Sequence, residues 1–161
     1  MVRRADPVSF IWAEAPLELS FLIEDWGFCG PERTGEGVAY HRPGLHVEMG
    51  AWSWKNERGF TTTLALIGGD GRQRRASLGV LYAASGLGTL SAAPEGAGTL
   101  DVIGKRIRQH AAALRALMAY LDEGDANALF ERCARQSSTV PDALQLTPQS
   151  QLSSRELRRL K

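Results

Sequence analysis

The sequence predicts an α+β fold: an N-terminal helix, an antiparallel meander sheet of about four strands, and a long and a short C-terminal helix packed on one sheet face. Apolar residues recur with helical spacing near both ends of the chain, at 19–26 and 103–121. Between these ends, residues 38–84 alternate apolar and polar side chains and are interrupted by short turns. Short turns join antiparallel neighbours, and helices at both ends would bury one face of such a sheet.

The first predicted helix begins near Pro16 and ends at Gly27. Its apolar stripe follows the i, i+3, i+4, i+7 spacing and comprises Leu19, Leu22, Ile23 and Trp26. Gly27 suits the left-handed conformation that often ends a helix, and Phe28 can fold back on the last turn. Residues 1–16 are expected to form a loose segment that docks its aromatic side chains on the domain, although Asp6-Pro7 has the form of a helix start.

Four strands are expected in the middle of the chain, after a polar loop at 31–37. Their approximate ranges are 38–41, 45–52, 60–67 and 76–84. In the second strand the odd positions Leu45, Val47 and Met49 would face the helices, and the even positions would face outward. In the fourth strand the inward positions would be Leu78, Val80 and Tyr82.

Residues 85–99 are expected to form a loop, and helical spacing resumes after Thr99, which can act as an N-cap. That helix would run to about Leu121, and Asp125 would cap a short helix at 126–135. Residues 1–135 are therefore interpreted as one domain. Residues 136–161 would form a loosely ordered tail, whose end, SSRELRRLK, has the capping pattern of a short basic helix.

Composition narrows the class of function. The net charge of +1 argues against a dedicated nucleic-acid binder, which would be strongly basic. No apolar run approaches the roughly 18–20 residues that cross a bilayer, and charged and proline residues interrupt the N-terminal region where a signal peptide would need an apolar stretch. The two cysteines, Cys29 and Cys133, are expected to be reduced thiols. We therefore expect a cytoplasmic protein without membrane contact or cofactor.

The outward positions of the second strand are the main candidate site. They carry His46, Glu48 and Trp52, continued by Trp54, and His41 lies across the turn. Three interpretations are open. The tryptophans could pack under the N-terminal segment or the long loop, with the histidines as ordinary surface residues.

Alternatively, the outward positions form a protein-binding face, because tryptophan and arginine are common anchors of interfaces. Arg72 and Arg74 are added to this set as partner-binding candidates. The third interpretation is a small metal-binding protein or hydrolase-like enzyme that uses His41, His46 and Glu48, because His46 and Glu48 share one side of a strand.

No catalytic motif supports an enzyme. The chain lacks the His-Glu-x-x-His and Pro-Cys-x-x-Cys patterns of zinc enzymes and the Gly-x-Ser-x-Gly turn of serine hydrolases. Residues 68–71 (GGDG) lack the Lys-Ser/Thr of a phosphate-binding loop and are typical of a hairpin. A nucleic-acid accessory role would have to rely on the basic tail, at Arg155, Arg158, Arg159 and Lys161.

One resemblance covers residues 17–135. The arrangement Phe21-Leu22-x-Glu24-x-x-Gly27-Phe28, then a loop, Val38-x-Tyr40 and alternating strands, resembles small uncharacterised bacterial proteins, many of them similar to immunity proteins of polymorphic toxin systems. The run from Leu114 to Phe130, with Leu121-x-x-Gly124-Asp125, is similar to their C-terminal helices. The resemblance implies a non-catalytic protein that binds and neutralises a toxin. The net charge of +1 departs from the acidic character of nuclease inhibitors, so a nuclease partner is less favoured.

Overall fold

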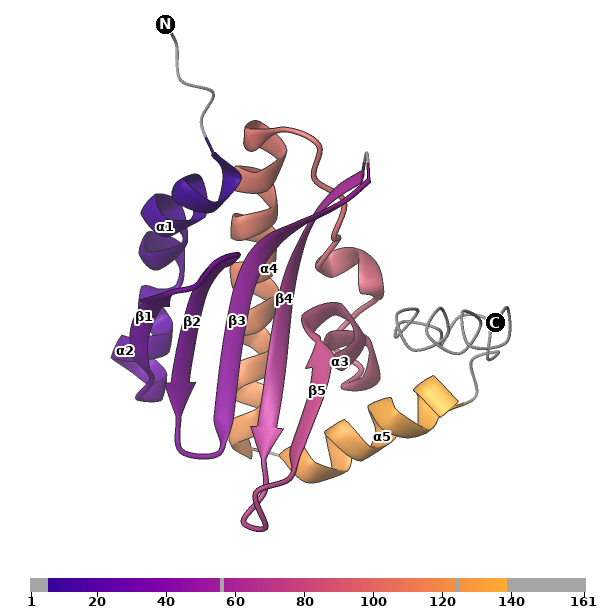
Figure 1. Cartoon of the computed structure of the whole chain (residues 1–161). Coiled ribbons are helices and arrows are strands. Elements are labelled where there is room, and N and C mark those ends of the chain that lie inside the picture. Colours follow the sequence, from indigo (N-terminus) through magenta and orange to yellow (C-terminus); the bar gives the residue numbers. More distant parts are fainter. Residues whose placement is uncertain (1–5, 56, 124, 139–161) are drawn as a thin grey trace, which may run out of the picture.

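The computed structural model describes residues 6–55, 57–123 and 125–138. It confirms the predicted α+β class, with an open antiparallel sheet of five strands in the order β1-β2-β3-β4-β5 (Figure 1). The elements are α1 (Pro7–Glu18), α2 (Ser20–Trp26), β1 (Cys29–Arg33), β2 (Gly37–Arg42), β3 (Leu45–Trp54), β4 (Glu57–Ile67), β5 (Gln73–Ser77), α3 (Leu78–Ala84), α4 (Leu100–Glu123) and α5 (Ala126–Ser138), with a 3₁₀ turn at Leu90–Ala92.

All helices cover the same face of the sheet (Figure 1). Helix α1 contacts β2 and β3, α4 contacts β4, and α3 and α5 contact β4 and β5. The odd positions of β3, Leu45, Val47 and Met49, are buried against this layer, as predicted. Burial of each such side chain contributes about 1.5–3 kcal/mol, which fixes the register of β3 and leaves its even positions on the opposite side. We call this opposite, uncovered side the outer face.

The hairpin of β3 and β4 projects beyond the rest of the sheet. Pairing between these strands runs from Leu45 opposite Leu66 to Trp54 opposite Glu57, whereas β2 begins at Gly37, opposite Gly50, and does not reach the end of the hairpin. The segment around Gly96, in the predicted loop 85–99, pairs with Gly59 on the other side of this arm. The projecting arm therefore has a neighbour on its β4 side.

The N-terminal segment is a helix, and the expected loose segment at 1–16 is wrong from Pro7 onward. The Asp6 carboxylate accepts hydrogen bonds from the backbone N–H groups of Val8 and Ser9 at 3.4 and 3.3 Å, so the helix start seen in the sequence forms. Helix α1 continues through Pro16, because burial of one apolar face outweighs the hydrogen bond that proline removes.

Helix α2 ends as predicted. Gly27 has a left-handed φ of 72°, and the N–H of Phe28 donates to the carbonyl oxygen of Leu22 at 3.0 Å. The predicted stripe is partly wrong, because Ile23 is exposed whereas Phe21 is buried. The short α2 is a separate helix after a break at Leu19, which rotates its buried face relative to the expected one.

Two strand assignments are wrong. Residues 29–33, expected to lie mainly in a loop, form the edge strand β1, whose five residues are all exposed and give no alternating pattern. The expected strand at 76–84 is the end of β5 followed directly by α3. The hydroxyl of Ser77 caps α3 by accepting from the N–H of Val80 at 3.4 Å. The positions expected to line an inward strand face, Leu78, Val80 and Tyr82, therefore lie on a helix, and the buried pair is Leu78 and Leu81.

The two C-terminal helices, α4 and α5, begin where the sequence predicted. The hydroxyl of Thr99 accepts from the N–H of Val102 at 3.3 Å, and the carboxylate of Asp125 accepts from the N–H of Ala128 at 3.3 Å. Helix α5 runs to Ser138, three residues beyond its predicted end at 135. The predictions for the tail from residue 139 onward lie outside the described residues. Within the described residues, no helix combines the length and apolar character that crossing a membrane requires.

Candidate functional site: the outer face and the adjoining cavity

The outer face carries short rows of side chains that run across the strands. His41 of β2 lies opposite His46 of β3, and the row continues to Ala65 and Arg75 on β4 and β5. The next row contains Ala39, Glu48, Thr63 and Ser77. Ala39 and Ala65 are buried among larger neighbours, so the polar side chains stand on a closely packed floor.

The two histidines lie side by side at one end of the outer face. Their ring centroids are 5.3 Å apart with the ring planes at 44°. The Glu32 carboxylate of β1 lies 3.7 Å from Nε2 of His41. Both imidazoles are half-buried, so they are held by their neighbours and remain open to solvent. The sequence predicted their common face, and the register explains their contact.

Glu48 does not join the histidines, although the sequence suggested a shared ligand. Its Oε2 lies 3.2 Å from a guanidinium nitrogen of Arg75, with which it forms a partly exposed ion pair. Within residues 6–55, 57–123 and 125–138, no three histidine, cysteine, aspartate or glutamate side chains form a ready-made metal site.

Trp52 lies at the far end of the outer face, on the projecting arm. Its indole ring rests on Gly59, the residue opposite it on β4, and a Cβ atom at Gly59 would collide with the ring. Glycine at this position gives the ring a place to lie flat on the neighbouring strand. The side chain remains 38% exposed, so neither the N-terminal helix nor the long loop covers it fully. The side chain of Trp54 lies outside the described part of the chain.

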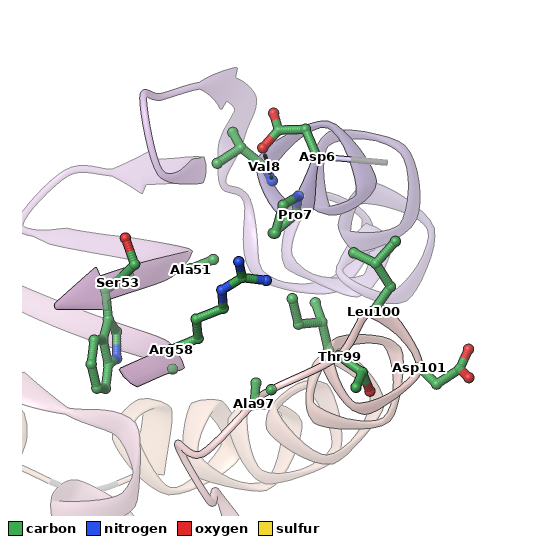
Figure 2. Close-up of a pocket in the computed structure, with 14 residues that line it drawn as sticks. Asp6, Pro7, Val8, Ala51, Ser53, Arg58, Ala97, Thr99, Leu100 and Asp101 are labelled. Atoms are coloured by element: carbon green, nitrogen blue, oxygen red, sulfur yellow. Dashed lines mark hydrogen bonds between the residues drawn. The ribbon is translucent and has the colours of Figure 1, made fainter. Parts of the chain in front are cut away.

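A cavity of about 730 Å³ opens beside Trp52. It lies between the projecting arm and the first residues of α1 and α4 (Figure 2). Arg58, opposite Ser53 on the arm, extends toward the space between Pro7 and Thr99 (Figure 2). Trp52 therefore belongs both to the outer face and to the lining of this cavity. The sequence did not indicate Arg58, because the cavity exists only where two helix starts, distant in sequence, meet the arm.

Arg72 and Arg74, the other predicted partner-binding residues, are not on the outer face. Arg72 follows the β4–β5 turn and pairs with Asp70 at 3.6 Å. Arg74 lies opposite Leu66 and pairs with Glu131 of α5 at 3.2 Å, on the side of the helices. Arg75 is the arginine of β5 that faces outward.

His110 of α4 is a buried histidine that the sequence did not indicate. Its Nε2 lies 2.7 Å from the carbonyl oxygen of Pro94, and its Nδ1 lies 2.8 Å from the hydroxyl of Thr62. Because a carbonyl oxygen only accepts, Nε2 carries the hydrogen and Nδ1 accepts from Thr62. Burial lowers the pKa of His110, an effect that the Pro94 carbonyl opposes and Arg106 reinforces. This neutral imidazole joins the segment before α4 to the core.

Comparison with known proteins yields no match to a family model, a curated protein or a solved structure.

Proposed function

We propose that the chain is a non-catalytic protein-binding module, and that its partner is a bacterial toxin that it neutralises in the cytoplasm. The observation that carries the binding proposal is Trp52, exposed on an uncovered sheet face and next to a cavity. The toxin class and the cytoplasmic location rest on the sequence resemblance alone.

The surroundings of Trp52 suit a protein interface. Tryptophan and arginine supply many of the residues that dominate binding energy, and Arg58 lines the same cavity. A cavity of this volume accommodates a large side chain or a short segment of a partner. The floor of the outer face consists largely of small and β-branched residues, so a partner can approach the strands closely.

The hydrolase-like alternative has less support. Its proposed carboxylate, Glu48, is paired with Arg75 instead of the histidines. His110 is hydrogen-bonded at both ring nitrogens and buried, so it offers no accessible base. The nucleic-acid alternative relies on tail residues that lie outside the described part of the chain.

Affinity capture from the native host, followed by titration calorimetry with the purified partner, tests the proposal. We expect Trp52→Ala to weaken binding by at least about 2 kcal/mol, roughly 30-fold, because a central anchor is removed. Leu17→Ala is the matched control, since Leu17 is 71% exposed on α1. Gly59→Ala displaces the indole ring without removing it and should also weaken binding.

Co-expression distinguishes binding from neutralisation. The captured partner should inhibit growth alone, and growth should recover with the wild-type chain but not with Trp52→Ala. Unchanged affinity of Trp52→Ala would disprove the proposed face. A tightly bound partner without toxicity would disprove the immunity role and leave the binding role standing.

A further inference from the structure

The spacing of His41 and His46 fits two ligands of one metal ion. Zinc is bound by histidine nitrogen at about 2.0–2.1 Å with tetrahedral angles, which places two coordinated imidazole centroids about 5 Å apart. The observed separation is 5.3 Å. Because the two residues are directly opposite on paired strands, the backbone holds their rings side by side at this spacing.

We propose that His41 and His46 bind one Zn²⁺ ion on the outer face, with water in the remaining positions. Imidazole is a common ligand of zinc and other late transition metals. The protein would supply only two ligands, because the described residues contain no group of three or more such side chains. The site is therefore weaker than structural zinc sites with four protein ligands. It does not depend on the proposed toxin partner.

Glu32 acts as a positioning residue in this site. Histidines that bind a metal usually donate their second ring N–H to a carboxylate or carbonyl, which fixes the ring and makes the ligand more basic. The Glu32 carboxylate lies 3.7 Å from Nε2 of His41, so a small rotation brings it to hydrogen-bond distance. Nδ1 of His41 is then the nitrogen left for the metal.

The residues around His41 and His46 determine which control variants the metal-binding experiment needs. Cys29 lies opposite His41 on β1 and is an exposed thiol, a potential competing ligand. Arg75, the nearest cation in the histidine row, is paired with Glu48. The third histidine of the chain, His110, is buried with both nitrogens hydrogen-bonded, so metal bound through imidazole is attributable to the pair.

Calorimetric titration of the tag-free, reduced full chain with ZnCl₂ at pH 7.5 tests the site. We expect one ion per chain, and at least tenfold weaker binding by His41→Gln and by His46→Gln. Glu32→Gln should weaken binding several-fold with unchanged stoichiometry, whereas Cys29→Ser and Trp52→Ala should bind as wild type. Near-UV circular dichroism of each variant verifies the fold.

Electron paramagnetic resonance with one equivalent of Cu²⁺ gives a second readout, in which hyperfine splitting from two imidazole nitrogens is expected. The proposal is overturned if wild type binds no Zn²⁺, if either histidine variant retains wild-type affinity, or if Cys29→Ser abolishes binding. Wild-type affinity in Glu32→Gln would overturn the positioning role.

Discussion

The two faces of the sheet carry histidines in opposite states. On the inner side, His110 contacts Thr62 and the Pro94 carbonyl, and every polar atom of its ring has a partner. On the outer side, His41 and His46 lie beside each other in contact with solvent. Burial makes a satisfied hydrogen-bond network necessary, because an unpartnered buried group costs free energy. The inner imidazole therefore serves stability, and the outer pair is available to bind a ligand.

Adjacent positions on β4 provide the strongest test of this difference. Leu64 points inward and is fully buried, whereas Thr63 points to the outer face and is half-buried. We expect Leu64→Ala to reduce the free energy of unfolding by about 2–5 kcal/mol, because it leaves a cavity in the core. Thr63→Ala should change it by no more than about 0.5 kcal/mol. Urea denaturation measures both, and equal losses would contradict the assignment of the two faces.

The buried His110 predicts that the free energy of unfolding depends on pH, and this effect is expected to be of intermediate size. Burial lowers the pKa of His110 below its ordinary value of 6.5, so the unfolded chain binds a proton more readily than the folded chain. The stabilising contribution of neutral His110 is therefore complete above about pH 6.5, the pKa in the unfolded chain. It is lost as the pH falls through the lower pKa in the folded chain. We expect the free energy of unfolding to fall between pH 7.5 and pH 5.5.

His110→Leu isolates this effect. It should cost about 1–3 kcal/mol at pH 7.5, because Thr62 and the Pro94 carbonyl lose their partner, and it should flatten the pH dependence. Chemical denaturation at both pH values measures the two quantities, with His46→Gln as the matched control on the outer face. An equally steep pH dependence in His110→Leu would show that another group is responsible.

The smallest expected change in the free energy of unfolding comes from a buried hydroxyl on β2. The hydroxyl of Tyr40 has no hydrogen-bond partner among the described residues, and burial raises the pKa of Tyr40 to about 12. Tyr40→Phe removes this unsatisfied group and retains the ring, so we expect the free energy of unfolding to rise by up to about 1 kcal/mol. Thermal and urea unfolding measure the change. A loss of more than 1 kcal/mol would reveal a partner for the hydroxyl.

The sequence predicted those parts of the fold whose signals are local. The alternation of apolar and polar residues predicted both faces of β3, and Thr99 and Asp125 predicted the starts of two helices. Both signals are local, because strand faces and helix caps depend on residues only a few positions away. Strand β1 gave no such signal, since all five of its residues are exposed and none alternates with a buried one. Residues 78–84 contain the β-branched Val80 and the aromatic Tyr82, which favour a strand, but they follow the capping Ser77, and packing under the sheet selected the helix.

The candidate site was predictable only in part. The common face of His46, Glu48 and Trp52 follows from spacing alone. The partners of these residues do not, because Glu32, Gly59 and Arg75 come from other strands, and pairing depends on the register of the whole sheet. His110 was not recognised because its partner Thr62 is 48 residues away in sequence.

The edge strand β1 has a consequence for how chains meet. An exposed strand edge offers unpaired peptide groups to which another chain can add, and this is a common route to aggregation. In β1, Pro31 lacks an N–H donor, the pairing is irregular between Cys29 and Glu32, and charged side chains follow. Such an edge is a poor template for a further strand. We therefore expect the sheet to resist extension by other chains at β1, while its outer face stays open to the proposed partner.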